Sequence, residues 1–414
     1  MADFTGIDFQ RVTTREQLLG FQECASVGFQ MKLPDSGPWL DAVSAQLETL
    51  DHRVAVDGSR TVGTFLSFDQ ELTAIGGAAV PVRAVSAVTV LPTHRRRGIL
   101  NRHMRTCLAE AHAAGAAAAT LVAAEYAIYG RFGFGPSTET VDYRIAVDPA
   151  RLPAPPVDEV RYVSGEEYLA ATFRMQELLD VPGRVTIPEL DMRRTAGLLR
   201  GDEPDPALRV VLRRGADVAG VLTYTVESKW AESRPDSTLK VTELVGVDAA
   251  AERDLWSFAM SIDWVRRVEA PQRPLDDLVS TVPADPRTVQ VSNRSDMLWI
   301  RPLDLPALFS ARTYAAAGRI VLDVTDPGFD GVGPGPAHGR FVISSDGGAG
   351  TCSATDEPAD LALDVTDLGR LWLSDEPASR RVATGSVREL TEGAAARADL
   401  MLFSPRRPWA VEHF

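Results

Sequence analysis

Three arginines followed by a glycine form the part of this sequence best suited to hold an anion. They lie in the run His94-Arg95-Arg96-Arg97-Gly98-Ile99-Leu100, directly before a segment with helical spacing. Backbone N–H groups at a helix start and the positive end of the helix dipole attract phosphate, and a glycine lets the backbone approach the ligand closely. The run therefore indicates a pyrophosphate site, although a solvated basic turn would look the same in isolation.

The elements around this turn favour the phosphate interpretation. Residues 84–90 are rich in β-branched side chains and are followed by Pro92, which indicates a strand and then a turn. Apolar residues then recur on one face of a helix, namely at Leu100, Met104, Cys107, Leu108 and Ala111. Gly115 is a suitable helix stop, and residues 118–124 resemble a second strand. The sequence thus predicts a strand, a turn, a helix and a strand.

Other common chemical motifs are missing from the sequence. It has no Gly-x-x-x-x-Gly-Lys run and no Gly-x-Gly-x-x-Gly after a strand, which argues against a P-loop and a dinucleotide site. The loop over 331–339 is rich in glycine, but its prolines lack the N–H donors of a phosphate cradle. The 6 histidines show no metal-ligand spacing and there is no Gly-x-Ser-x-Gly elbow, so we expect neither a metal site nor a serine hydrolase.

Length and composition bound the class of protein. A chain of 414 residues with 45% hydrophobic and 24% charged residues is typical of a globular protein with two or three domains. Cys24, Cys107 and Cys352 are far apart and in no Cys-x-x-Cys pair, as expected for buried free thiols. The formal net charge of -14 argues against a nucleic-acid partner and favours a cationic ligand, although an acidic balance also serves solubility alone.

The sequence shows no membrane or export signal. No stretch approaches the ~18 consecutive apolar residues of a spanning helix, and residues 1–8 lack the basic and apolar regions of a signal peptide. We therefore expect a cytoplasmic protein without a membrane partner.

Proline clusters mark the expected domain boundaries. Prolines crowd residues 149–156, where they interrupt regular structure, and a second cluster covers 271–286. The apolar strand expected at 297–302 follows that second cluster and would enter a third unit. We predict three domains, over residues 1–148, 149–290 and 291–414.

The third domain has the pattern of a small α+β fold. Strand-like segments at 341–344 and 351–354 flank Asp346-Gly347-Gly348, which is typical of a hairpin turn. Another strand is expected at 361–365, and helical spacing predicts a helix over 387–402. No internal repeat with a period of 20 to 50 residues is visible.

A second motif follows the strand at 118–124. It reads Glu125-Tyr-Ala-Ile-Tyr-Gly-Arg-Phe-Gly-Phe-Gly135, and by itself it indicates only a strand packed closely at a turn. Together with the run from Thr89 to Gly98, this segment resembles the GNAT acetyltransferases and, among them, the actinobacterial Eis family of aminoglycoside acetyltransferases. The resemblance covers the whole chain and includes its last residue, Phe414, because Eis-type enzymes end in an aromatic residue.

The resemblance implies an α+β fold with two GNAT-type mixed-sheet domains, the second of them degenerate, and a C-terminal domain similar to sterol carrier proteins. It also implies acetyl-CoA as cosubstrate and a homohexamer. The residues that would contact the pantetheine are Val88, Thr89 and Val90. Those that would hold the pyrophosphate are Arg96, Arg97, Gly98, Ile99, Leu100 and Asn101, and those that would flank the acetyl arm are Ala124 and Glu125.

Two positions depart from the family pattern. Leu100 stands where many GNAT proteins have Gly or Ala two residues after the motif glycine, and Ala124 stands where the family can place a hydroxyl. We expect the pyrophosphate grip to survive, with one side-chain hydrogen bond to the cofactor lost.

By resemblance, Tyr129 is the general acid and the α-carboxylate of Phe414 the general base. A phenol with a pKa of about 10 is protonated at neutral pH, whereas an α-carboxylate with a pKa of roughly 3.3 to 3.7 is ionised and attracts a cationic amine. Glu125 is the competing base. Trp39, Glu412 and His413 are candidates for the substrate wall, although each can equally be a surface or core residue.

The expected function is acetyl transfer to amines of aminoglycoside-like polycations, at one position or several. A protein or peptide lysine acetyltransferase is the alternative within the same class. A lipid-binding protein with a vestigial GNAT domain is the alternative from another class.

Overall fold

The computed structural model describes residues 5–31, 37–201, 204–329 and 333–410. The described residues form two compact units. Unit 1 combines the segments 1–138, 180–186 and 296–414, and unit 2 combines 139–179 and 187–295. The chain therefore leaves and re-enters unit 1 twice.

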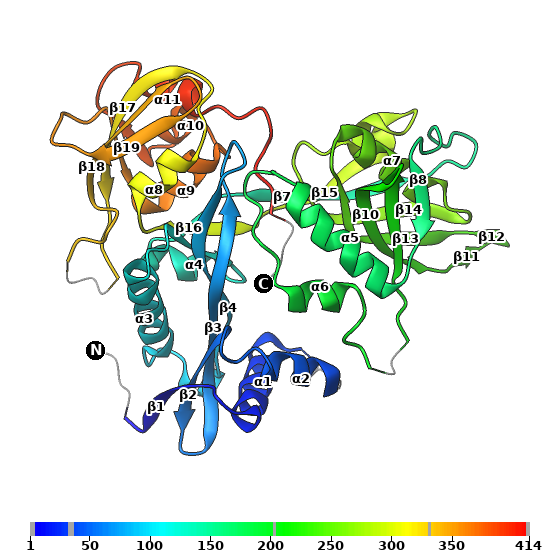
Figure 1. Ribbon diagram of the computed structural model, residues 1–414, viewed down its shortest axis with the longest axis horizontal. Coiled ribbons are helices and arrows are strands. Elements are labelled where there is room, and N and C mark those ends of the chain that lie inside the picture. The colour runs from blue at the N-terminus through cyan, green and yellow to red at the C-terminus, as the bar shows by residue number, and fades with distance from the viewer. Residues whose placement is uncertain (1–4, 32–36, 202–203, 330–332, 411–414) are drawn as a thin grey trace. The chain divides into compact units, whose positions relative to one another are not determined.

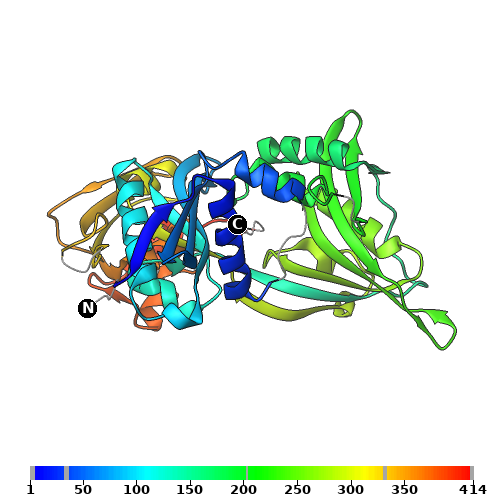
Figure 2. The same ribbon diagram turned by 90° about the horizontal axis from the view of Figure 1, so that it is seen from below.

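Unit 1 is built on a mixed sheet of seven strands: β1 (Ile7–Arg11), β2 (Asp51–Asp57), β3 (Arg60–Thr73), β4 (Ala79–Val90), β5 (Ala118–Val122), β6 (Gly135–Pro136) and β16 (Leu298–Pro302). Their order in the sheet is β1-β2-β3-β4-β5-β16-β6, and β4 and β5 form its parallel pair. The helices are α1 (Arg15–Phe29), α2 (Gly37–Ser44), α3 (Ile99–Ala113) and the short α4 (Tyr126–Tyr129). Helices α1 and α3 lie on opposite sides of the strands (Figure 1, Figure 2).

Local sequence explains these elements. Helix α1 starts at Thr14, whose side chain accepts from the N–H of Gln17 while Gln17 reaches back to the Thr14 backbone, a capping box. In β4, Val80, Val82 and Ala84 are buried at every second position, as in a strand with one face in the core. The predicted strand, helix and strand over 84–124 are confirmed by β4, α3 and β5.

Unit 2 repeats the same topology. Its strands are β7 (Glu139–Ala146), β8 (Glu159–Tyr162), β9 (Leu208–Arg214), β10 (Asp217–Glu227), β13 (Ser237–Gly246), β14 (Val265–Arg273) and β15 (Val289–Asp296). Read from β8, their order β8-β9-β10-β13-β14-β7-β15 matches that of unit 1, and the parallel pair β13–β14 corresponds to β4–β5. The unit also contains α5 (Gly165–Leu178), α6 (Glu189–Thr195), α7 (Ala249–Ser261) and the hairpin of β11 (Trp230–Ala231) and β12 (Arg234–Pro235).

Strand pairing reassigns two segments near the expected domain boundaries. Strand β7 precedes the expected boundary at 148, yet it pairs with β14 in unit 2. Strand β16, expected to enter the third domain, pairs with β5 and β6 in the first sheet. Prolines show where regular structure stops, but they do not show which sheet the adjoining strand joins. The ranges 1–148, 149–290 and 291–414 stay a prediction.

The C-terminal part of unit 1 is the expected small α+β fold. Its sheet has the order β19-β18-β17-β20-β21. The strands are β17 (Ala317–Thr325), β18 (Gly339–Asp346), β19 (Gly350–Ala354), β20 (Leu361–Asp364) and β21 (Val387–Glu389). The helices are α8 (Leu305–Ala311), α9 (Val365–Leu373), α10 (Ala378–Ala383) and α11 (Ala394–Leu402). Short 3-10 turns elsewhere are η1 (Pro92–His94), η2 (Gly130–Phe132), η3 (Leu278–Thr281) and η4 (Pro286–Thr288).

The helix expected over 387–402 is shorter than predicted. Its first residues form β21, because Val387 pairs with Leu363 in the sheet. Helix α11 begins only after Gly393, whose φ of +77° stops a helix from extending further toward the N-terminus. The predicted strands at 341–344, 351–354 and 361–365 are confirmed by β18, β19 and β20.

A shared core joins the C-terminal part to the first sheet. One apolar cluster contains Leu72 and Val82 from β3 and β4 together with Phe309, Ile343 and Trp372. Burial of these side chains accounts for the assignment of both parts to one compact unit.

A buried arginine ties two helices of this part together. Arg312 donates to the carbonyls of Leu371 and Trp372 at the end of α9 and to Leu402 at the end of α11. Burial lowers its pKa to about 10. Carbonyls at helix C-termini carry partial negative charge, so they stabilise this cation in the core.

The three cysteines are buried and free, as expected. No helix in the described part of the chain is long and apolar enough to cross a membrane.

Candidate active site

The first sheet opens between its two parallel strands. Register between β4 and β5 runs from Val82↔Ala118 to Ala84↔Thr120, whereas β4 continues to Val90. Beyond Thr120, β5 pairs only with β16 in the described residues. Backbone N–H and C=O groups on this side of residues 85–90 therefore have no sheet partner and need water or a ligand.

A β-bulge lies at this opening. The register between β3 and β4 shifts between Thr64↔Thr89 and Leu66↔Ser86. Ala87 has a φ of +48°, and its carbonyl accepts from the Thr64 hydroxyl at 2.6 Å. A bulge re-aims the strand and ends regular pairing. It thus explains why the last residues of β4 separate from β5.

Val88, Thr89 and Val90 lie in the opened part of β4, as predicted. Val88 packs against the cluster under α3, and the Thr89 side chain is buried against α1. A Cβ added to Gly28 of α1 would lie 1.9 Å from the Thr89 hydroxyl. A ligand in the opening would therefore meet backbone groups of Thr89 rather than its hydroxyl.

The arginine turn leads from β4 directly to the start of α3. Gly98 is the N-cap residue, has a φ of +91° and supplies no side-chain cap. The first N–H groups of a helix have no intrahelical partner, so those of Ile99, Leu100 and Asn101 are available to an anion. Ile99 itself is buried, hence its N–H rather than its side chain can reach a ligand. The positive end of the helix dipole lies at the same place.

The three arginines of the turn have different environments. Arg96 is exposed and has a φ of +64°, which is unusual for a residue with a side chain. Arg97 donates to the Thr5 carbonyl at 2.7 Å, and Arg95 to the Val90 carbonyl at 3.4 Å. The turn therefore presents a cationic surface whose backbone is held in a specific conformation.

Unit 2 provides an internal comparison for the helix start. Helix α7, the counterpart of α3, is capped by Asp248, whose carboxylate accepts from the Ala251 N–H at 2.9 Å. A hydrogen bond from Arg214 lowers the pKa of Asp248 to about 2. A negative carboxylate thus occupies the place that a phosphate would need.

In the second sheet, a side chain of the same unit occupies the place where β13 and β14 separate. Buried Arg273 at the end of β14 donates to the Leu244 carbonyl of β13 and pairs with Asp277 at 2.6 Å. Leu244 belongs to the part of β13 beyond its register with β14. In unit 2, a carboxylate thus caps the helix start and an arginine bridges the separated strand, whereas the described residues of unit 1 show neither; the degenerate character of the second domain stays a prediction.

The second motif lies after β5. Ala124 and Glu125 are exposed, and Glu125 is the N-cap residue of α4. Tyr129 at the end of α4 is 7% exposed and contacts Phe134 edge-to-face. Burial, together with the negative charge of Glu125, raises the pKa of Tyr129, so the phenol stays protonated at neutral pH.

A buried ion pair holds the loop that follows Tyr129. Arg301 of β16 donates to the Phe132 carbonyl at 2.8 Å and to the Asp326 carboxylate at 2.7 Å. Both charged side chains are fully buried. Gly133 has a φ of +82°, and a Cβ there would lie 2.5 Å from the Arg301 Nε atom. The close contact needs a glycine at this position.

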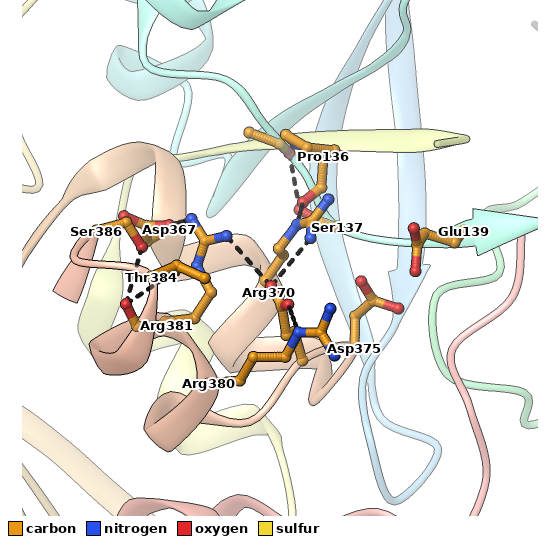
Figure 3. A network of polar contacts seen from close by, with 12 residues as sticks. Pro136, Ser137, Glu139, Asp367, Arg370, Asp375, Arg380, Arg381, Thr384 and Ser386 are labelled. Atoms are coloured by element: carbon orange, nitrogen blue, oxygen red, sulfur yellow. Dashed lines mark hydrogen bonds and ion pairs between the residues drawn. The ribbon is translucent and has the colours of Figure 1, made fainter. Parts of the chain in front are cut away.

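The end of the same loop contacts the C-terminal part. A Cβ on Gly135 would overlap the Thr366 carbonyl of α9, and Arg370 donates to the Pro136 carbonyl at 2.6 Å (Figure 3). Figure 3 also shows Arg381 beside Arg370, where Asp367 and Glu376 accept from these two arginines. The α9 region therefore helps to position the loop that carries Tyr129.

Sequence reasoning missed Arg301 and Asp326 as supports of this loop. An arginine inside the apolar run 297–302 was the available signal, because a charged residue in a buried strand needs a partner. Asp326 gave no comparable signal, since its partner lies 25 residues away in sequence.

Of the four remaining predicted site residues, only Trp39 lies within the described part of the chain. Trp39 is half-buried on α2. Glu412, His413 and Phe414 lie outside the described residues. Within the described part of the chain, no group of three or more His, Cys, Asp or Glu side chains could hold a metal ion.

Three parts of the chain match known domain families. Residues 10–137 and 190–302 each match an acetyltransferase (GNAT) domain, and residues 305–411 match a sterol carrier protein domain. The expected α+β fold with two GNAT domains and a C-terminal sterol-carrier-like domain is thereby confirmed.

Curated relatives cover most of the chain. An uncharacterized N-acetyltransferase of Streptomyces avermitilis is 40% identical over 371 residues, which are 87% of this chain and 87% of the relative. The N-acetyltransferase Eis of Mycobacterium tuberculosis is 32% identical over 357 residues, or 80% of each chain.

Solved structures share the fold over the full length. The crystal structure of Eis1 from Mycobacterium abscessus has a TM-score of 0.83 at 28% identity and covers 99% of this chain and 100% of that one. A GCN5-related N-acetyltransferase from Kribbella flavida has a TM-score of 0.75 at 22% identity and covers 100% of both chains, which shows the same fold.

Proposed function

Because this chain belongs to the Eis family of GNAT N-acetyltransferases, we propose that it transfers acetyl groups from acetyl-CoA to amines of aminoglycoside-like polycations, at one position or several. The observation that carries the coenzyme assignment is the opening of the first sheet at Ala84, which leads to the uncapped start of α3. The net charge of -14 supports a cationic acceptor. The cytoplasmic location and the homohexamer stay predictions.

The coenzyme would lie along the opened strand and the helix start. Backbone groups of Val88, Thr89 and Val90 would hydrogen-bond the pantetheine arm, while N–H groups over 96–101 would bind the diphosphate. Ala124 and Glu125 would flank the acetyl end. Acetyl-CoA supplies an activated acyl group as a thioester.

The proposed chemistry is a direct transfer. The carboxylate of Phe414 takes a proton from the ammonium group of the acceptor, and the neutral amine attacks the carbonyl carbon of the thioester. As the C–N bond forms and the C–S bond breaks, the Tyr129 phenol gives its proton to the departing thiolate. The resulting phenolate takes up the second proton that leaves the nitrogen as the amide forms. Trp39, Glu412 and His413 would line the acceptor side. Glu125 is the alternative base.

The helix start can be tested at Gly98. Changing Gly98→Ala should weaken the affinity for acetyl-CoA about 10-fold, because an alanine with left-handed φ costs about 1–2 kcal/mol and relaxation would move the N–H groups. Gly115→Ala is the matched control, since Gly115 has a φ of +82° and open space at the other end of α3. Calorimetric titration measures both. Equal affinities in the two variants would argue against binding at the helix start.

The acceptor class can be tested by following thiol release with aminoglycosides, polyamines and lysine peptides. We expect turnover with the aminoglycosides and a KM that rises with salt concentration, because screening weakens attraction between an acidic site and a polycation. Turnover of lysine peptides alone would contradict the proposed acceptor. Binding of a sterol without binding of acetyl-CoA would instead indicate a lipid-binding protein with a vestigial site.

A further inference from the structure

Helix α9 contacts two different parts of unit 1. Three apolar side chains at the spacing i, i+3 and i+4 pack into the core that joins the C-terminal part to the first sheet, namely Leu368, Leu371 and Trp372. Three other residues with the same spacing contact the end of the Tyr129 loop (residues 130–137), namely Thr366, Gly369 and Arg370. The core therefore fixes one face of α9, and another face holds the loop.

Two glycines bring the helix and the loop into close contact. A Cβ on Gly369 would overlap the Ser137 hydroxyl, and a Cβ on Gly135 would overlap the Thr366 carbonyl. Ser137 is fully buried, and its hydroxyl donates to the Gly135 carbonyl at 2.9 Å. The end of the loop is therefore packed against α9 with no room for a larger residue at either glycine.

Arg370 adds a charged hydrogen-bond donor to this contact. Its Nε atom donates to the Pro136 carbonyl at 2.6 Å (Figure 3), and its Nη1 atom donates to the Glu376 carboxylate at 3.1 Å. Glu376 also pairs with Arg380 at 2.7 Å and with Arg381 at 3.2 Å. Burial acts in the opposite direction, but hydrogen bonds from Arg370 and Arg381 lower the pKa of Glu376, so this carboxylate is ionised at neutral pH. An anion thus keeps the Arg370 guanidinium in place.

The contact with α9 leads directly to Tyr129. Phe134, the residue before Gly135, donates its N–H to the Tyr129 carbonyl at 3.4 Å and packs edge-to-face on the Tyr129 ring. The middle of the loop is fixed separately, by Arg301 at the Phe132 carbonyl. A shift of residues 135 and 136 would therefore move the phenol through Phe134.

We propose that the C-terminal part, which matches a sterol carrier protein domain, acts as a brace for the Tyr129 loop, and that Arg370 is a positioning residue for the phenol. The inference rests on the proposed function, because Arg370 would act only through Tyr129. Precise placement matters, since a displacement of about 1 Å can lower a catalytic rate by about 10²-fold. In this role the C-terminal part serves acetyl transfer without binding a lipid.

The first experiment separates positioning from stability. Arg370→Met should lower kcat per folded molecule about 10-fold, as expected for loss of a charged hydrogen-bond donor, while the Kd for acetyl-CoA stays unchanged. Arg381→Met is the matched control, because Arg381 is 22% exposed where Arg370 is 15% exposed, and it donates to Glu376 and Asp367. It should lower the stability but keep kcat within about 2-fold. Equal losses of kcat in the two variants would overturn the positioning role.

Arg370→Lys decides the question if Arg370→Met does not fold. Lysine keeps a positive charge beside Glu376 but has one nitrogen in place of the two that serve Glu376 and Pro136. We expect kcat to fall about 3-fold, as for a weakened hydrogen bond, with an unchanged Kd for acetyl-CoA. An unchanged kcat would remove Arg370 from this role.

The second experiment asks whether Arg370 acts through Tyr129. In a Tyr129→Phe chain, the substitution of Arg370 should have no further effect on kcat, because the group that it positions is gone. An equal effect of the Arg370 substitution in both chains would contradict the brace and leave Tyr129 as the proposed acid. An unchanged kcat in Tyr129→Phe alone would instead refute the proposed acid, and the brace with it.

Discussion

Tyr129→Phe should lower kcat about 10²- to 10⁴-fold, the usual contribution of a positioned proton donor. The phenol is buried among Phe134 and other apolar side chains, so removing one oxygen leaves the packing intact. The departing thiolate would then have no acid to protonate it. The Kd for acetyl-CoA should not change, because the proposed coenzyme contacts lie on β4 and α3. Stopped-time thiol assays and calorimetry measure the two quantities.

Tyr126→Phe is the matched control for this prediction. Tyr126 lies on the same short helix, but it is 63% exposed and contacts Trp299 edge-to-face. The change should leave kcat within about 2-fold, as expected for a conservative surface substitution that alters stability by less than about 0.5 kcal/mol. Equal losses in both variants, or none at Tyr129→Phe, would exclude the phenol as general acid.

The raised pKa of Tyr129 adds a prediction for pH dependence within the same experiment. Burial and the nearby Glu125 carboxylate both favour the neutral phenol. The acid form therefore persists beyond the ordinary pKa of about 10 and is lost only when the pH rises through the higher folded value. A decline in kcat caused by ionisation of this phenol should not be seen below about pH 10.

Arg301→Met should destabilise unit 1 by about 3–5 kcal/mol, because it leaves the Asp326 carboxylate buried without its cation. The same change removes the donor to the Phe132 carbonyl, so the loop after Tyr129 loses its main fixed point. We therefore expect kcat per folded molecule to fall as well. Urea unfolding measures the stability, and assays at 10 °C on the folded protein measure the rate.

Arg273→Met is the matched control, because Arg273 and Asp277 form a similarly buried ion pair in unit 2. It should lower the stability of unit 2 by a comparable amount without changing kcat per folded molecule. Replacing both partners, Arg301→Met with Asp326→Leu, should recover part of the stability, since a buried charge pair often costs as much as an apolar pair of similar size. If Arg301→Met leaves kcat unchanged, the ion pair only stabilises the fold.

Some parts of the candidate site could be predicted from the sequence, because they depend on residues that are neighbours along the chain. The β-branched run before Pro92, the arginines with Gly98 and the apolar face of α3 are neighbours along the chain, and each has a local physical cause. The tyrosine motif was found in the same way. Its role, however, came from resemblance, since aromatics between glycines indicate only close packing.

Other parts depend on contacts between residues that are distant in sequence. The bulge at Ala87 requires the register with β3, and the sequence of β4 alone reads as a regular strand. The sequence also gives no sign that β7 joins the second sheet and β16 the first. The hydrophobic pattern of a strand shows which of its faces is buried, but not which strand it pairs with.

By itself, the sequence determined the family and the order of domain types, and it predicted an anion-binding turn and a candidate acid. Only the tertiary structure decided that β4 separates from β5 after Ala84, that Asp248 and Arg273 close the equivalent place in unit 2, and that Arg301 holds the loop after Tyr129. The reason is physical: helix starts and turns follow from neighbouring residues, whereas strand pairing and buried ion pairs form between segments that only folding brings together.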